Sequence, residues 1–179
     1  MMVKRVMPIA VLMVVCLSGV GSAKEVTPMQ VLFTTKQFFP TCSEVTIFSS
    51  KEYFQKNKDK IARAAAQNKI KPHVYIVEKS TDIGNALSSI ADNSILVIFD
   101  SATLDKSNNK LYILSKCKTK KVTIITSSQQ FSNSGALLGI LLDNDHKIKM
   151  VLNLKHNSFL KDKFTPDTIA KFGIAKVIE

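Results

Sequence analysis

The stretch Ser134-Gly135-Ala136-Leu137-Leu138-Gly139-Ile140 decides the fold, because of the strand and helix units that precede it. Three of the predicted strands that come before it end in small or polar residues: Ser49-Ser50, Asp100-Ser101 and Thr126-Ser127-Ser128. Parallel strands whose polar carboxyl ends share one edge are typical of the open α/β sheets that hold a ligand at that edge. The sequence therefore predicts an α/β chain with a binding edge.

Helical and strand patterns alternate along the middle of the chain. Predicted strands cover 44–48, 73–77, 94–99 and 121–126, and predicted helices cover 28–39, 53–67, 81–91 and the segment around 111–114. The run 94–99 is continuously apolar, as in a central parallel strand that is covered on both faces. Strands joined by helices of this length form right-handed crossovers, so we expect a three-layer sandwich with a mostly parallel, Rossmann-like sheet.

The last third of the chain changes to a β-rich pattern. The runs 135–142 and 147–154 flank Asp143-Asn144-Asp145-His146, and short Asn/Asp loops favour hairpins. Apolar residues in the second run alternate largely with lysines, so we expect a C-terminal β-hairpin whose second arm lies at an exposed sheet edge. A short helix is predicted to begin near Thr165-Pro166-Asp167, and residues 173–178 close the chain.

The N-terminal residues have the pattern of a secretory signal. Lys4 and Arg5 precede a 15-residue, mostly apolar run at 6–20, and Gly21-Ser22-Ala23 supplies small residues for cleavage. This run is shorter than the about 20 residues that a membrane-spanning helix needs. An uncleaved N-terminal anchor is the alternative interpretation. We expect a signal peptide of residues 1–23, cleaved after Ala23. The remaining residues 24–179 then form a single periplasmic domain that does not itself span the membrane.

Lysine dominates the charge of the chain. Without residues 1–23 the chain has 23 basic and 14 acidic residues, a formal charge of +9, and Arg63 is its only arginine. Recognition of phosphates and bases favours arginine, and export separates the protein from cytoplasmic nucleic acid. We therefore expect no nucleic-acid partner, whereas an anionic lipid surface or an acidic partner is compatible with the charge.

Known catalytic and metal-binding motifs are missing from the sequence. It contains no Cys-x-x-Cys, His-Glu-x-x-His or Gly-x-Ser-x-Gly motif and no phosphate-cradling glycine loop. Asp143, Asp145 and His146 lie together, but polar residues in a turn usually interact with solvent alone. We expect a protein that is not an enzyme and holds neither a metal nor a cofactor.

Seven residues at the predicted strand ends form the candidate ligand-binding site. Their hydroxyl groups, the backbone amides of the following helices and one carboxylate suit a small organic ligand with a carboxylate and an amine. Such residues also cap helices, and the two roles are compatible. The candidates are Ser49, Ser50, Asp100, Ser101, Thr126, Ser127 and Ser128.

Two cysteines remain after the predicted cleavage. An exported protein with an even number of cysteines can form a disulfide, so Cys42 and Cys117 are a candidate pair. Two unpaired, buried thiols are the alternative.

Several segments occur in an order found in a known family. They include Phe39-Pro40, the STDIGNAL run at 80–87, Phe99-Asp100 and the segment 134–138. On these segments, residues 29–145 resemble one lobe of the periplasmic substrate-binding proteins of ABC transporters, in the group of tryptophan- and tyrosine-uptake receptors. The resemblance implies a small organic solute as ligand. Such receptors close two lobes around their solute, whereas this chain has room for one, because a hairpin replaces the long crossover.

A second resemblance concerns the C-terminal half. Gly135, the run 147–154 and the final helix are similar to periplasmic regulators of the YfiR type, which restrain an inner-membrane diguanylate cyclase. This alternative implies an inner-membrane signalling protein as partner. The hairpin edge would then pair with a partner strand, with Lys147, Lys149 and Asn153 as candidate partner-binding residues.

Overall fold

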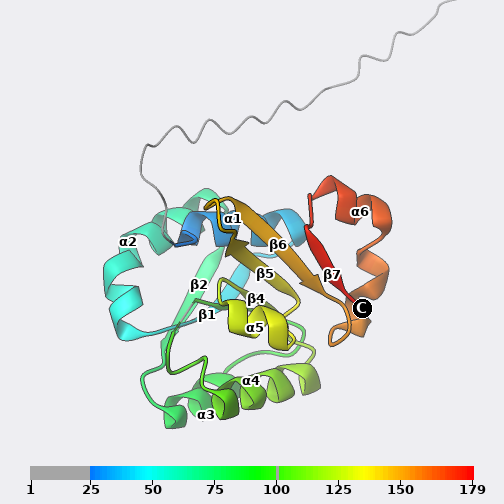
Figure 1. Cartoon of the computed structure of the whole chain (residues 1–179). Coiled ribbons are helices and arrows are strands. Elements are labelled where there is room, and N and C mark those ends of the chain that lie inside the picture. Colours follow the sequence, from blue (N-terminus) through cyan, green and yellow to red (C-terminus); the bar gives the residue numbers. More distant parts are fainter. Residues whose placement is uncertain (1–24, 100) are drawn as a thin grey trace, which may run out of the picture.

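A seven-stranded sheet forms the centre of the protein (Figure 1). The computed structural model describes residues 25–99 and 101–179, so the predicted signal peptide and Asp100 lie outside the described residues. The strand order is β2-β1-β3-β4-β5-β6-β7. The strands are β1 (Glu44–Ser49), β2 (Lys71–Ile76), β3 (Ile95–Ile98), β4 (Thr123–Thr126), β5 (Leu138–Leu142), β6 (Ile148–Asn153) and β7 (Lys176–Ile178).

The sheet is mostly parallel, as predicted. Strands β1 to β5 all run in one direction, β6 is antiparallel to β5, and β7 is parallel to β6. Strands β3 and β4 are buried along their whole length, which explains why the sequence of β3 is continuously apolar. The carboxyl ends of the five parallel strands therefore share one edge of the sheet.

Helices cover both faces of the sheet and complete the three-layer sandwich. On one face, α1 (Pro28–Phe38) and α2 (Lys51–Gln67) bury Val31, Leu32 and Ile61 against the sheet. On the other face lie α3 (Ser80–Ser88), α4 (Ser107–Thr119) and α5 (Gln129–Ser134). A 3₁₀ helix, η1 (Ser158–Lys163), and α6 (Pro166–Lys171) follow β6. Figure 1 shows α3 and α4 side by side, on the side of the sheet away from α1.

Local capping chemistry sets where several helices begin. The Ser50 hydroxyl accepts the N–H of Tyr53 at 3.2 Å at the start of α2. Thr165 caps α6, which begins at Pro166, where the sequence predicts a short helix. At α3 the carboxylate of Asp82 accepts two backbone N–H groups, which lower the pKa of Asp82. These caps satisfy donors that a helix start otherwise leaves free.

The predicted C-terminal hairpin is confirmed, but only the first half of its second arm lies at an exposed edge of the sheet. Strands β5 and β6 pair with Leu138 opposite Leu152 and Leu142 opposite Ile148. The outer side of β6 is covered at Val151–Asn153 by β7, the last strand of the chain. The pairing is non-local, because it joins strands separated by η1 and α6, and a three-residue strand gives little periodic signal in the sequence.

The turn from α5 into β5 explains the glycines of the opening stretch. Gly135 ends α5 with a φ of 136°, which other residues rarely adopt. Gly139 lies against the side chain of Ser132, so that a Cβ at position 139 would overlap the Ser132 hydroxyl. The sequence did not predict α5 itself.

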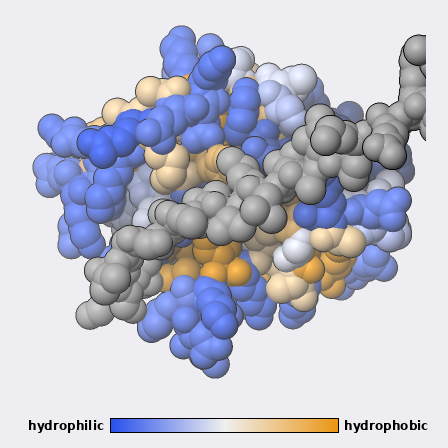
Figure 2. Space-filling view, turned by 90° about the horizontal axis from the view of Figure 1, so that it is seen from above, coloured by the Kyte–Doolittle hydropathy of each residue, from blue (hydrophilic) through white to orange (hydrophobic). Residues whose placement is uncertain are grey.

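The outer surface carries most of the polar residues. Figure 2 shows hydrophilic residues over most of the face that is seen from above, with hydrophobic residues in patches between them. Within residues 25–99 and 101–179, no helix is both long enough and apolar enough to span a bilayer.

Candidate functional site

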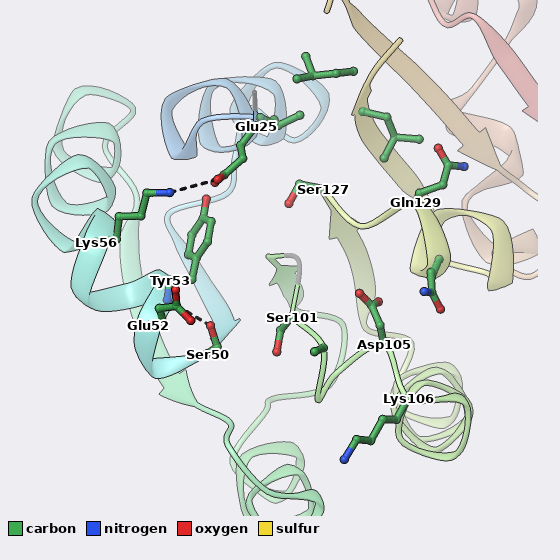
Figure 3. A pocket seen from close by; sticks show the side chains of 15 residues that line it. Glu25, Ser50, Glu52, Tyr53, Lys56, Ser101, Asp105, Lys106, Ser127 and Gln129 are labelled. Carbon is green, nitrogen blue, oxygen red and sulfur yellow. Dashed lines mark hydrogen bonds and ion pairs between the residues drawn. The ribbon is translucent and has the colours of Figure 1, made fainter. Parts of the chain in front are cut away.

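A pocket of about 910 Å³ lies at the carboxyl edge of the parallel strands (Figure 3). Ser50, Ser101 and Ser127 follow β1, β3 and β4, and Leu141 and Leu142 end β5. Because β2 lies on one side of β1 and β3 on the other, the chain leaves β1 and β3 in opposite directions across the sheet. Open α/β sheets bind ligands at such a switch point.

Two helices begin at the pocket. Ser50 is the N-cap of α2, and Ser128 is the N-cap of α5, where its hydroxyl accepts the N–H groups of Gln130 and Phe131 at 3.2 and 3.3 Å. The N-terminal turn of a helix carries a partial positive charge, which favours an anionic group nearby. Of these two helices α2 is the longer, with 17 residues.

Charged side chains of both signs line the same space. Asp105 lies on the wall formed by the segment between β3 and α4, and its Oδ1 accepts the Ser128 hydroxyl at 2.7 Å. Lys106 follows it, and Figure 3 shows Asp105 among Ser101, Ser127 and Gln129. On the opposite wall the Lys56 ammonium group lies 3.1 Å from the Glu25 carboxylate. Both carboxylate and ammonium groups therefore line the pocket.

An aromatic pair supports one wall. The ring of Tyr53, a pocket-lining residue on α2, stacks on the buried ring of Phe99 with centroids 4.8 Å apart and planes 21° from parallel. Phe99 directly follows β3. This stack packs the first turn of α2 against the residue that follows β3, close in sequence to the pocket-lining Ser50 and Ser101.

The structure describes six of the seven predicted ligand-binding residues, and they fall into two groups. Ser50, Ser101 and Ser127 line the pocket. The hydroxyls of the other described candidates bond within the fold: Ser49 donates to Ser50 O, Thr126 donates to Ile98 O, and Ser128 donates to Asp105. Asp100 lies outside the described residues.

Sequence reasoning missed the charged and aromatic lining residues. They come from the segment before α1 and from the first turns that follow each strand end: Glu25, Glu52, Tyr53, Lys56, Asp105, Lys106, Gln129 and Gln130. Apart from Glu25, these residues lie three to eight places after the end of β1, β3 or β4. The available signal was therefore position, since residues that closely follow a parallel strand lie at the same edge as the strand end.

The candidate partner-binding residues do not form one surface. Lys147 and Lys149 are exposed, but Asn153 is 1% exposed, and its Oδ1 accepts the N–H of His156 at 3.4 Å. Since β7 also covers β6 at this position, Asn153 is not accessible to a partner strand in this structure. The hairpin turn is closed by Asp143, whose Oδ1 accepts the N–H groups of Asp145 and Lys147.

The candidate disulfide does not form in the structure. Both Cys42 and Cys117 are free thiols. Cys42 packs against the core on the α1 and α2 face of the sheet, whereas Cys117 belongs to the core on the α3 and α4 face. The sheet separates them, so the expected pair is replaced by its alternative of two unpaired thiols, of which Cys117 is buried and Cys42 partly so.

Comparison with protein-family models and with curated proteins gave no match. Solved structures with a similar fold include a conserved domain protein from Vibrio cholerae (TM-score 0.71, 13% identity, 84% of this chain). They also include the ABC domain from Streptococcus pneumonia in complex with L-Trp (TM-score 0.66, 12% identity, 84% of this chain). A third is the ligand-free, open structure of a substrate-binding protein with adhesive properties from Clostridium difficile (TM-score 0.67, 13% identity, 86% of this chain).

This chain spans 60% of the length of each of these three structures. The comparisons do not support the resemblance to YfiR-type regulators. At 12–13% identity the similarity concerns the fold alone. The chain has the three-layer α/β fold of a periplasmic-binding-protein-like lobe.

Proposed function

We propose that this chain is an exported, non-enzymatic binding protein that holds a small organic ligand with both an anionic and a cationic group. The observation that carries the proposal is the pocket of about 910 Å³ at the switch point of the sheet, lined by serines and by charges of both signs. Pockets of roughly 300–1,000 Å³ are the size that small-molecule ligands occupy.

We place the ligand's anionic group near the start of α2, although the carboxylate of Glu52 in the first turn also lines the pocket. Backbone N–H groups and the partial positive charge of a helix start stabilise a carboxylate, and the Ser50 and Ser101 hydroxyls line this part of the pocket. The cationic group has its best place at Asp105, whose carboxylate is already oriented by Ser128. An amino acid carries both groups.

Binding without chemistry fits the residues at the pocket. Among the described lining residues there is no histidine and no cysteine, and the buried Ser128 hydroxyl beside Asp105 is engaged as a helix cap. Two of the three similar structures are described as an L-Trp complex and as a substrate-binding protein, which supports a solute-binding role for a chain of this fold.

A panel of charged small molecules tests the proposal. Thermal shift and calorimetry of the full chain should show stabilisation by amino acids, and weaker effects of simple carboxylates or simple amines, because each of these satisfies one wall only. Asp105→Asn should lower the affinity by about 10–100-fold, the range for a lost charge-assisted hydrogen bond. Asp145→Asn, in the exposed hairpin turn, is the matched control and should change nothing. No response to any amino acid, or equal binding by the Asp105 variant, would contradict the proposal.

Export is a separate part of the proposal. We infer that residues 1–23 direct the chain to the periplasm and are removed, since a charged start, an apolar run and small residues precede Lys24. Mass spectrometry of the protein recovered from the periplasm should find Lys24 as its first residue. Recovery of the full-length chain in the membrane fraction would favour the uncleaved anchor instead.

A further inference from the structure

The helix α4 and the residues that flank it carry a concentration of positive charge. Residues 106–121 include six lysines and no aspartate or glutamate, and no acidic residue occurs between Asp105 and Asp143. Two of these lysines serve the fold: Lys120 Nζ donates to Leu87 O and Ile90 O at the end of α3, and Lys110 Nζ donates to the Gln130 side chain. The other four are exposed: Lys106, Lys116, Lys118 and Lys121.

Large apolar side chains are exposed on the same helix. Leu111 and Tyr112 keep 59% and 44% of their surface accessible, whereas Asn109, Ile113 and Cys117 face the core. Tyr112 also lies under Lys116, whose Nζ is 5.7 Å from the ring centroid. The outward side of α4 therefore combines apolar surface with cations.

A shallow groove extends this surface to η1. It has a volume of about 270 Å³ and runs between α4 and η1, with Leu111, Leu114 and Lys118 on one side and Phe159, 42% exposed, on the other. We call Leu111, Tyr112, Lys116, Lys118, Lys121 and Phe159 together the α4 surface.

We propose that the α4 surface docks the protein on an anionic lipid membrane. Peripheral membrane binding combines aromatic and aliphatic side chains that enter the headgroup region with lysines that face anionic lipids, and the α4 surface offers both. Nucleic acid fits less well, because the one arginine of the described chain, Arg63, lies on α2 across the sheet. The docking surface is also separate from the pocket that carries the proposed function.

The chain contains no tryptophan, which allows a local probe. The full chain with Leu111→Trp should show a blue shift of its fluorescence and protection from an aqueous quencher when phosphatidylglycerol vesicles are added. Vesicles of phosphatidylcholine alone should have little effect. Ile148→Trp, at an exposed position on β6, should not respond to either vesicle. The fluorescence reports only on the surroundings of residue 111, so vesicle binding through the N-terminal residues alone would leave the Leu111→Trp signal unchanged. Vesicle binding without a change in this signal would overturn the proposal.

Charge-matched variants on the Leu111→Trp background complete the test. Lys116→Gln, Lys118→Gln and Lys121→Gln together should weaken vesicle binding by on the order of 100-fold, at roughly fivefold per lysine near an anionic surface. Lys51→Gln, Lys58→Gln and Lys60→Gln together remove the same charge from exposed positions on α2 and should leave binding nearly unchanged. Equal losses in both triple variants would overturn the proposal, as would a response to an oligonucleotide but not to vesicles. Circular dichroism checks that both variants fold.

Discussion

The hydroxyl of Ser128 lies 2.7 Å from Oδ1 of Asp105 and also accepts two N–H groups at the start of α5. One side chain thus starts a helix and orients a carboxylate on the wall of the pocket. Because Ser128 is 1% exposed, water cannot easily replace it in either role.

Replacement of Ser128 by alanine should therefore destabilise the protein. We expect Ser128→Ala to lower the free energy of unfolding by about 1–2 kcal/mol, the range for a lost helix cap, measured by urea denaturation. Ser127→Ala, one residue earlier at a half-buried position on the pocket wall, should change the stability by less than about 0.5 kcal/mol. Equal effects of the two substitutions would show that the cap does not matter.

A methyl group at position 139 should not fit. Gly139→Ala places a Cβ on the buried side chain of Ser132, and such overpacking costs about 1–3 kcal/mol. The control is Gly84→Ala within α3, where a Cβ would meet nothing within 4 Å; it should stabilise the protein by about 0.5–1 kcal/mol through helix propensity. Thermal and urea denaturation distinguish the opposite signs, and a stabilising Gly139→Ala would contradict the packing of α5 on β5.

Lys120 should contribute to stability through α3. Its ammonium group donates to Leu87 O at 3.1 Å and to Ile90 O at 2.7 Å, so Lys120→Met leaves both carbonyls without this donor. We expect a loss of about 1 kcal/mol in the free energy of unfolding, and faster amide exchange at the end of α3. Lys118→Met removes the same charge from an exposed position on α4 and should leave stability and exchange unchanged.

The buried thiol of Cys117 should make the protein less stable at alkaline pH. Burial raises the pKa of Cys117 from 9.0 to about 12, with Lys120 partly opposing the rise. The unfolded chain therefore releases this proton at a lower pH than the folded chain. Stability from this group is fully present below pH 9 and decreases as the pH rises from 9 toward 12, by at most about 1.4 kcal/mol per pH unit.

Comparison with Cys117→Ala isolates this contribution, because the substitution removes this thiol and leaves every other titratable group in place. Urea denaturation between pH 8 and pH 10 should show a smaller loss of stability for the variant than for the parent chain. A thiol reagent at neutral pH should also modify Cys117 far more slowly in the folded than in the unfolded protein. Parallel pH profiles would contradict the burial of a protonated thiol.

Local chemistry explains which parts of the fold the sequence predicts. The apolar run of β3, the Ser50 cap and the start of α6 at Pro166 depend on neighbouring residues, and they are found where the sequence predicts them. The six residues of α5 lack a helical period, and this helix depends on the Ser128 cap and on the buried ring of Phe131. The pairing of β7 with β6 depends on contacts between distant residues.

The sequence predicts that the polar strand ends lie together, but it does not predict the charged residues that line the pocket beside them. The hydroxyl-bearing strand ends do lie at one edge, because parallel strands end together. Which hydroxyls face the pocket depends on side-chain direction, so Ser101 lines it while the Thr126 hydroxyl bonds to Ile98 O. The carboxylate of Asp105 comes from the segment after β3, for which the sequence offers no periodic signal.

The hairpin between β5 and β6 has a consequence for how this architecture can be enlarged. Leu141 and Leu142 border the pocket, and the exposed residues 144–146 follow within a few positions. Exposed turns accept inserted segments most readily. Extra chain grafted between Asp143 and Lys147 would emerge beside the mouth of the cavity and could roof it over, with the register of every strand left intact. The hairpin turn is thus a position at which an additional domain that covers the pocket can be inserted.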